Sequence, residues 1–158
     1  PKAMQVEFSR FVQEQADGLK RELNQKEIVE IFETEFLNRE DRVTLEEIMV
    51  KRHNVEAPTD RVSVEATLMI DGEKRHRTHS GDGALNALAG ILHDAGFPFH
   101  VTAYDEHAMS AGSDAIAAAY IGIELENGTA MFGAGTDSDI SLASANALIS
   151  GVNRAFKK

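Results

Sequence analysis

Two short segments of this chain carry residues suited to binding a small carboxylate. Residues 80–86 are Ser-Gly-Asp-Gly-Ala-Leu-Asn and residues 135–141 are Gly-Thr-Asp-Ser-Asp-Ile-Ser, and each precedes a stretch with helical spacing that is rich in Ala and Leu. The first turn of a helix has backbone N–H groups without intrahelical partners, and the helix dipole adds partial positive charge there. Two such helix starts facing each other would form a site for a small organic acid.

The other chemically reactive side chains form weaker patterns. His76 and His79 lie an odd number of positions apart on one predicted strand, so they point to opposite faces and cannot share a metal ion. Asp137 and Asp139 fit helix caps better than a calcium loop, because the rest of such a loop is absent. Ser80 lacks the Gly-x-Ser-x-Gly context of an exposed nucleophile. These patterns predict neither a metal site nor a catalytic serine.

Small residues mark two places where a ligand could approach the main chain. Gly81 and Gly83 allow a tight turn from strand to helix, and they leave space beside the backbone. Residues 104–120 are dense in Ala, Gly and Ser. Such a stretch indicates either close packing of two backbones or a gap filled by a small apolar ligand, and the composition leaves both open.

The composition excludes several classes of function. The 158 residues, 42% of them apolar, suffice for one core and a small helical appendage. A net charge of −10 argues against a nucleic-acid surface, because such surfaces neutralise phosphates with Lys and Arg. There is no cysteine and no apolar run of roughly 18 residues, so we expect a cytoplasmic protein without a membrane span. The chain starts at Pro1 rather than at a Met, which suggests a piece of a longer protein.

Hydrophobic patterns and turn signals predict a duplicated α+β fold. The turn signals Asp71-Gly72 and Asn127-Gly128 stand 56 positions apart, from 72 to 128. Strands are expected at residues 43–52, 61–70 and 73–80 with a helix at 84–95, and then at residues 99–108, 115–125 and 129–135 with a helix at 140–156. This order predicts two βββα units related by an internal pseudo-twofold duplication, over residues 42–96 and 97–158.

The two copies differ just before their turns. The second predicted strand alternates cleanly, with Val62, Val64, Ala66, Leu68 and Ile70 expected to point inward. Ile70 stands one residue before its turn, whereas the last inward residue of the other copy, Leu125, stands two residues before its turn. This offset predicts a bulge or a changed turn in one copy.

Residues 1–41 are expected to form a helical linker subdomain ahead of the domain at residues 42–158. Apolar residues at helical spacing predict a first helix at residues 6–16, and Asn24 and Glu27 fit a capping box at the start of a second. The two apolar stripes exceed what a pair of short helices can bury against each other. We therefore expect these helices to pack on the following domain, on a second subunit or on a missing upstream domain.

Several segments of this chain resemble a known family. They are the motif at residues 80–85, the stretch from Tyr104 to Ala119, the pairs Asp139-Ile140 and Ala143-Ser144, and the closing Asn153-Arg154. They are similar to the C-terminal regulatory domain of 2-isopropylmalate synthase. The opening residues Pro-Lys-Ala-Met-Gln-Val-Glu-Phe-Ser resemble the helical linker that joins this domain to the enzyme's catalytic barrel. The resemblance covers nearly the whole chain.

This resemblance implies an acyltransferase as the parent enzyme. The family condenses acetyl-CoA with 2-oxoisovalerate in leucine biosynthesis, inside a barrel that uses a divalent metal. That barrel is not in this sequence, so we expect the fragment to be inactive alone and to hold no cofactor. The family's regulatory domain forms a homodimer and binds leucine between its two βββα units, which inhibits the distant active site.

The resemblance also implies a set of leucine-binding residues. They lie at the first helix start, on the fourth and fifth strands and at the second helix start: Gly81, Asp82, Gly83, Leu85, Asn86, Val101, Tyr104, Ala108, Ala115, Ala117 and Ile140. Both helix starts could hold the ligand carboxylate, and Asp82 or backbone carbonyls could hold its ammonium group.

The chain departs from the family pattern at three positions beside this set. Asp82, Ala84 and Asn86 stand where the family usually has Asn, Pro and a small apolar residue. The sequence therefore leaves two alternatives to a leucine sensor: the regulator of a citramalate-type synthase that senses isoleucine, and a purely structural dimerisation module.

Overall fold

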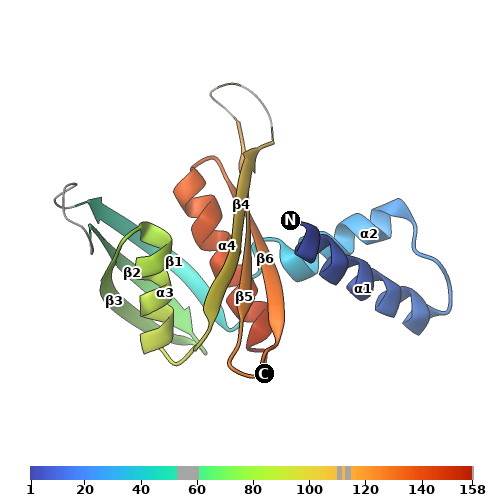
Figure 1. Cartoon of the computed structure of the whole chain (residues 1–158), viewed down its shortest axis with the longest axis horizontal. Coiled ribbons are helices and arrows are strands. Elements are labelled where there is room, and N and C mark those ends of the chain that lie inside the picture. Colours follow the sequence, from blue (N-terminus) through green and yellow to red (C-terminus); the bar gives the residue numbers. More distant parts are fainter. Residues whose placement is uncertain (53–60, 110–111, 113–114, 158) are drawn as a thin grey trace.

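The structure of this chain, a computed structural model, describes residues 1–52, 61–109, 112 and 115–157. Two three-stranded antiparallel sheets are each followed by a helix, and helices precede both (Figure 1). The predicted α+β fold of two βββα units behind a helical segment is therefore confirmed.

The N-terminal segment contains two α-helices and one turn of π-helix. α1 spans Lys2–Leu19, longer than predicted, and ends at Lys20 in the left-handed conformation with φ 58°. α2 spans Gln25–Ile31 and continues into the π-helix η1, Phe32–Phe36. The predicted capping box is confirmed, because the Asn24 side chain accepts from the Glu27 N–H while the Glu27 side chain accepts from the Asn24 N–H.

The first unit consists of β1 (Val43–Arg52), β2 (Val62–Ile70), β3 (Glu73–Gly81) and α3 (Ala84–Asp94), with sheet order β1-β2-β3. The alternation predicted for the second strand is confirmed: all its inward residues are at most 2% exposed. They face α3, so the central strand supplies much of the core of this unit.

The second unit repeats this order with β4 (His100–Ala108), β5 (Ala117–Glu124), β6 (Ala130–Asp137) and α4 (Ile140–Ala155). Its sheet order is β4-β5-β6. The free edge of β6 is covered by the linker, because the Asn38 N–H donates to the Ala134 carbonyl and its side-chain amide donates to Thr136. β4 is the opposite edge and is exposed along almost its whole length.

The duplication extends to details of the backbone. The pairing of β1 with β2 is interrupted between Leu45 and Glu47, and that of β4 with β5 between Val101 and Ala103, which lie 56 positions later. The turns differ, as the offset between Ile70 and Leu125 predicts. The first is a two-residue turn, whereas the second has one residue more, with hydrogen bonds from Leu125 N–H to Thr129 and from Gly128 N–H to Leu125.

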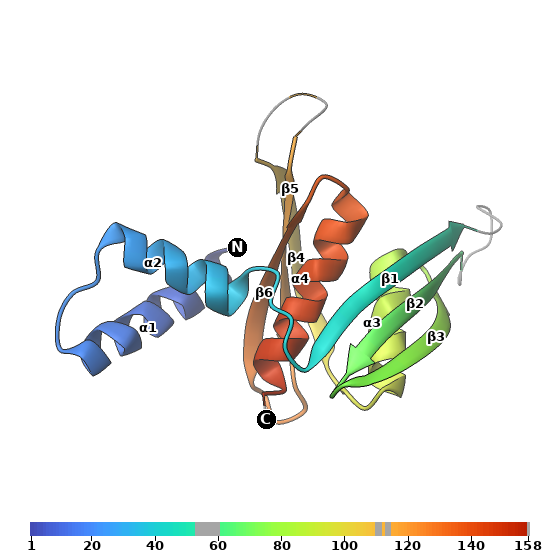
Figure 2. The same ribbon diagram turned by 180° about the vertical axis from the view of Figure 1, so that it is seen from behind.

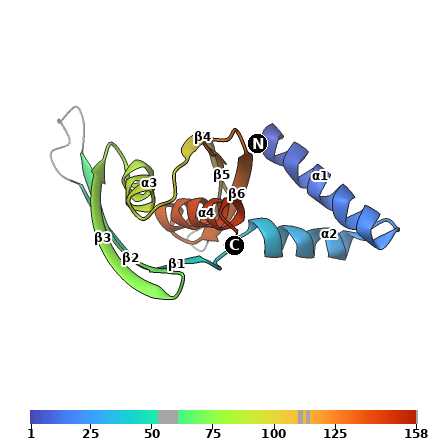
Figure 3. The same cartoon turned by 90° about the horizontal axis from the view of Figure 1, so that it is seen from below.

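The two units share one hydrophobic core. Figure 3 shows the first sheet curving around α3, with α4 between β1 and the second sheet. The N-terminal helices meet the second sheet at β6, on the face away from α4, where a smaller cluster joins Met4 and Phe36 to Phe132 and Ala134 (Figure 2). β6 is thus packed on both faces, and Phe132, which points away from α4, is only 6% exposed.

Within the part of the chain that the structure describes, no helix is long and apolar enough to cross a membrane.

Candidate functional site

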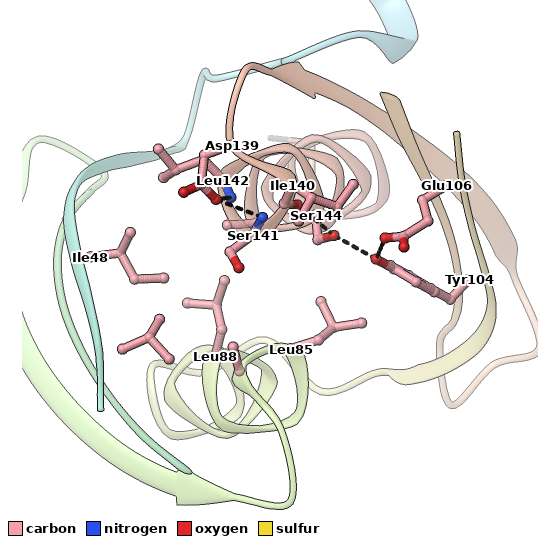
Figure 4. Close-up of a pocket in the computed structure, with 13 residues that line it drawn as sticks. Ile48, Leu85, Leu88, Tyr104, Glu106, Asp139, Ile140, Ser141, Leu142 and Ser144 are labelled. Carbon is pink, nitrogen blue, oxygen red and sulfur yellow. Dashed lines mark hydrogen bonds between the residues drawn. The ribbon is translucent and has the colours of Figure 1, made fainter. Parts of the chain in front are cut away.

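A cavity of about 450 Å³ lies between the N-terminal ends of α3 and α4 (Figure 4). β1 forms its wall in the first unit and β4 its wall in the second. The lining residues are Ile48, Val50, Ala84, Leu85, Leu88, Tyr104, Glu106, Asp139, Ile140, Ser141, Leu142, Ser144 and Ala145. The volume is in the usual range for a small-molecule site, roughly 300 to 1,000 Å³.

The lining follows the duplication. Each first-unit residue in the cavity has a lining counterpart 56 positions later: Ile48 and Tyr104, Val50 and Glu106, Ala84 and Ile140, Leu85 and Ser141, Leu88 and Ser144. The cavity therefore lies where the two copies face each other, on the pseudo-twofold axis of the fold.

The two halves of the cavity differ in chemistry. Among the described residues, the first unit contributes only aliphatic side chains to the lining. In the second unit, three of the five counterparts have become hydroxyl groups and one a carboxylate. A ligand with one apolar and one polar end would match this division.

The two helix starts also differ. Asp139 is the N-cap of α4, and its carboxylate accepts hydrogen bonds from the N–H groups of Ser141 at 2.8 Å and Leu142 at 3.2 Å. The prediction that Asp139 is a helix cap is confirmed. Gly83 is the N-cap of α3 and makes no side-chain cap, and a Cβ built there meets no atom within 4 Å. The α3 start, rather than the α4 start, therefore keeps its capacity to bind an external carboxylate.

A hydrogen-bonded group of three side chains forms the polar wall. The Tyr104 hydroxyl donates to Oε2 of Glu106 and lies 2.8 Å from the Ser144 hydroxyl (Figure 4). Ser144 also lies within 3.0 Å of the Ile140 carbonyl oxygen. Partial burial, and next the bond to the Glu106 carboxylate, raise the pKa of Tyr104 above its usual value of 10.0, so this hydroxyl is a proton donor at neutral pH.

Three residues of the predicted leucine set line the cavity: Leu85, Tyr104 and Ile140. Asp82 and Asn86 lie at the start of α3 outside the lining. Gly81 packs against Asn86, because a Cβ at Gly81 would lie 2.3 Å from Oδ1 of Asn86.

The other predicted residues lie along the second sheet. Ala108 pairs with Ala117 on the sheet face that carries Tyr104, two residues beyond Glu106, and Ala115 precedes β5. Val101 is at the other end of β4, opposite Ile123. None of these four belongs to the cavity lining that the structure describes.

Several lining residues were not anticipated from the sequence. Ile48 and Val50 belong to the predicted first strand, and Glu106 and Ser144 belong to the stretches that carry the family resemblance. Applying the 56-residue repeat to Tyr104 would have pointed to Ile48. Glu106 would have followed from the alternation of its strand, which puts it on the same face as Tyr104.

The part of the chain that the structure describes contains no group of three His, Asp or Glu side chains placed to hold a metal ion.

Comparison with known proteins gives one consistent family. Residues 22–156 match the family model of the LeuA allosteric (dimerisation) domain. The chain is 39% identical over 156 residues to a 2-isopropylmalate synthase of Corynebacterium efficiens and 38% identical over 160 residues to one of Mycobacterium ulcerans. These matches take in 99% of this chain but 26% and 28% of the two relatives. The chain therefore spans about a quarter of the length of the curated relatives it matches.

Proposed function

Because this chain belongs to the LeuA allosteric (dimerisation) domain family, we propose that it is the regulatory part of a 2-isopropylmalate synthase and that its cavity binds leucine. The whole protein would condense acetyl-CoA with 2-oxoisovalerate, with the catalytic groups in the part of the relatives that this chain does not span. Leucine, the end product of the pathway, would inhibit that reaction from a distance. The isolated chain would have no turnover.

The observation that carries this proposal is the cavity between a capped and an uncapped helix start. The ligand carboxylate would accept hydrogen bonds from N–H groups in the first turn of α3, next to Gly83. Such charge-assisted bonds are about twice as strong as neutral ones. Gly83 leaves the space that a ligand oxygen needs there.

The isobutyl group of leucine would lie on the aliphatic half of the cavity, against Ile48, Leu85 and Leu88. Burial of four carbon atoms is worth about 3 kcal/mol at roughly 0.8 kcal/mol per CH₂ group. Valine has one carbon fewer, so this term predicts an affinity for valine about fourfold lower.

The homodimer that the family name suggests would form along β4. This strand is an unpaired sheet edge, and exposed apolar side chains lie on it, beside it and at the α4 start: Val101, Tyr104, Met109, Ile116 and Ile140, each 40–60% exposed. Pairing of this edge with a second copy would satisfy its backbone groups and cover these side chains. Ile140 and Tyr104 also line the cavity, so ligand binding and dimerisation would share residues.

Calorimetric titration of the chain with leucine, isoleucine and valine tests the proposal, together with analytical ultracentrifugation for the dimer. We expect a dimer that binds leucine with a dissociation constant of about 1 mM or below, and valine about fourfold more weakly. Tighter binding of isoleucine would favour the citramalate-type regulator. A dimer that binds none of the three would favour a structural module and contradict leucine sensing.

A further inference from the structure

A cavity on a pseudo-twofold axis could accept a ligand in two opposite orientations. In this chain the duplicated positions have diverged, so that the two orientations are no longer equivalent. The largest chemical difference is between Val50 of β1 and its counterpart Glu106 of β4. The side chain at position 106 therefore has the most influence on which way a ligand lies.

The Glu106 carboxylate is incompletely satisfied by the chain itself. Its Oε2 accepts from the Tyr104 hydroxyl, while Oε1 has no partner among the described residues. Among the described residues, no Lys, Arg or His lines the cavity, and none forms an ion pair with Glu106. A carboxylate beside a partly enclosed cavity without a countercharge favours a cationic ligand group.

Asp139, the other carboxylate in the lining, is placed differently. It accepts two backbone N–H bonds at the positive end of α4, so its charge is already compensated. Asp82 does not line the cavity. Glu106 is therefore the acidic group best placed to meet an ammonium ion inside the cavity.

We propose that Glu106, positioned by Tyr104 and Ser144, binds the ammonium group of an α-amino acid and so fixes one ligand orientation in the cavity. This inference rests on the proposed function and deepens it. The carboxylate of the ligand points to the α3 start, its ammonium group to Glu106, and its side chain to the aliphatic half of the cavity. The cavity thereby selects amino acids over the corresponding carboxylic acids, which lack the ammonium group.

Tyr104 and Ser144 are positioning residues in this arrangement. The single proton of the Tyr104 hydroxyl is donated to Glu106, because an ionised carboxylate can only accept. The Tyr104 oxygen then accepts from Ser144 when the serine proton turns away from Ile140. This chain of hydrogen bonds holds Oε2 of Glu106 and leaves Oε1 without a partner among the described residues.

The test is a cycle of two ligands and two proteins, measured by calorimetry on the whole chain. L-leucine and 4-methylpentanoate differ only in the amino group, and Glu106→Gln removes the charge without changing the size of the side chain. We expect the unsubstituted chain to bind leucine at least about tenfold more tightly than 4-methylpentanoate, and Glu106→Gln to reduce this ratio to about threefold or less.

The same substitution should leave the affinity for 4-methylpentanoate unchanged or raise it, because a repulsive carboxylate is removed. A misfolded variant could not give this result, so it also serves as a folding control. Tyr104→Phe should reduce the ratio in the same direction but less, since Glu106 keeps its charge.

Asp105→Asn is the matched control. Asp105 stands one residue earlier on β4 and points to the opposite face of the sheet, towards Tyr120, so the same change of charge there should leave the ratio unaltered. If leucine binds but Glu106→Gln keeps the original ratio, the inference is overturned while the proposed function stands. If leucine does not bind the unsubstituted chain, both fail.

Discussion

The two helices of the duplicated fold, α3 and α4, start at equivalent positions but have different tasks. α3 has 11 residues and a glycine N-cap without a side-chain bond, whereas α4 has 16 residues and an aspartate N-cap. α3 packs on a strand that presents Arg77 and His79, and α4 packs on the counterparts Gly133 and Gly135. The second copy therefore has a side-chain cap at its helix start, and the first copy has none.

The C-terminal half of α4 attaches the linker and the start of β1 to the second unit. The Ser150 hydroxyl donates to the Phe36 carbonyl at 2.6 Å, and the Asn153 amide bonds both the N–H and the carbonyl of Val43 at 2.8 Å. Arg154 bonds Glu7, Glu35 and the Phe132 carbonyl, and its guanidinium lies 3.8 Å from the Phe36 ring centre. α3 ends at Asp94, the counterpart of Ser150, so it has no helical turn that corresponds to Asn153 and Arg154.

The largest expected effect comes from removing this attachment. Arg154→Met should lower the free energy of unfolding by about 3–5 kcal/mol, because Glu7 and Glu35 lose their buried countercharge. Denaturation in urea measures this change. Lys157→Met is the control, since Lys157 also pairs with Glu35 but is 47% exposed, and we expect about 1 kcal/mol or less. Equal effects of the two substitutions would contradict the role given to α4.

A pair of glycine substitutions compares the helix packing of the two units. A Cβ at Gly135 would lie 2.2 Å from the Ala143 carbonyl oxygen and 2.4 Å from the Ala147 nitrogen, both main-chain atoms. Gly135→Ala should therefore cost about 2–3 kcal/mol of stability through overpacking.

In the first unit, the three atoms nearest to a Cβ at Gly90 all belong to the ring of His79, a side chain that can move. Gly90→Ala should stay within about 1 kcal/mol of the unsubstituted chain, because the gain in helix propensity offsets the crowding. Thermal denaturation of both variants checks the difference, and similar losses would show that the two helices pack alike.

A substitution at the α3 start would make the first unit resemble the second. Gly83→Asp places a carboxylate where α4 has Asp139, with backbone angles that an aspartate can adopt, φ −151° and ψ 173°. It should weaken leucine binding by about 10- to 100-fold, since charged hydrogen bonds are worth roughly 1.5–3 kcal/mol. Gly83→Asn caps the same N–H groups without charge and should weaken binding less. An unchanged affinity in calorimetry would show that the α3 start does not hold the ligand.

The smallest effect concerns the polar wall at high pH. Burial and the Glu106 carboxylate raise the pKa of Tyr104 in the folded chain, so the unfolded chain ionises first as the pH rises. The contribution of Tyr104 to stability is therefore present below pH 10 and lost above it. Absorbance titration of the chain, with Tyr104→Phe to identify the signal of Tyr120, should show that Glu106→Gln lowers the pKa of Tyr104. No change would mean that the two side chains do not interact in solution.

Features with a local cause could be predicted from the sequence. The turn pair at Gly72 and Gly128 gave the repeat length, and the offset between Ile70 and Leu125 predicted a bulge or a changed turn in one copy, which the structure shows as a longer second turn. Turn chemistry and strand alternation are set by neighbouring residues, so they are visible without the fold. The capping box at Asn24 has the same local origin.

Contacts between distant segments could not be predicted in this way. Glu7 and Arg154 are separated by 147 positions, and nothing in the spacing of either predicts the other. The cavity is formed jointly by β1, β4, α3 and α4. The residues of its aliphatic half could therefore be identified only from the arrangement of the two units. The repeat itself indicated part of the lining, because pairs of lining residues are 56 positions apart. Which face of each copy meets the other depends on the shared core.

Isotope-filtered nuclear magnetic resonance of the chain with carbon-13-labelled leucine tests the central claim most directly. The account predicts nuclear Overhauser contacts from the leucine methyl groups to Ile48 and Leu88 of the aliphatic half, and from the leucine α-proton to Tyr104. Contacts confined to the N-terminal helices, or to the outer face of the second sheet around Tyr120, would contradict a ligand held between the two helix starts.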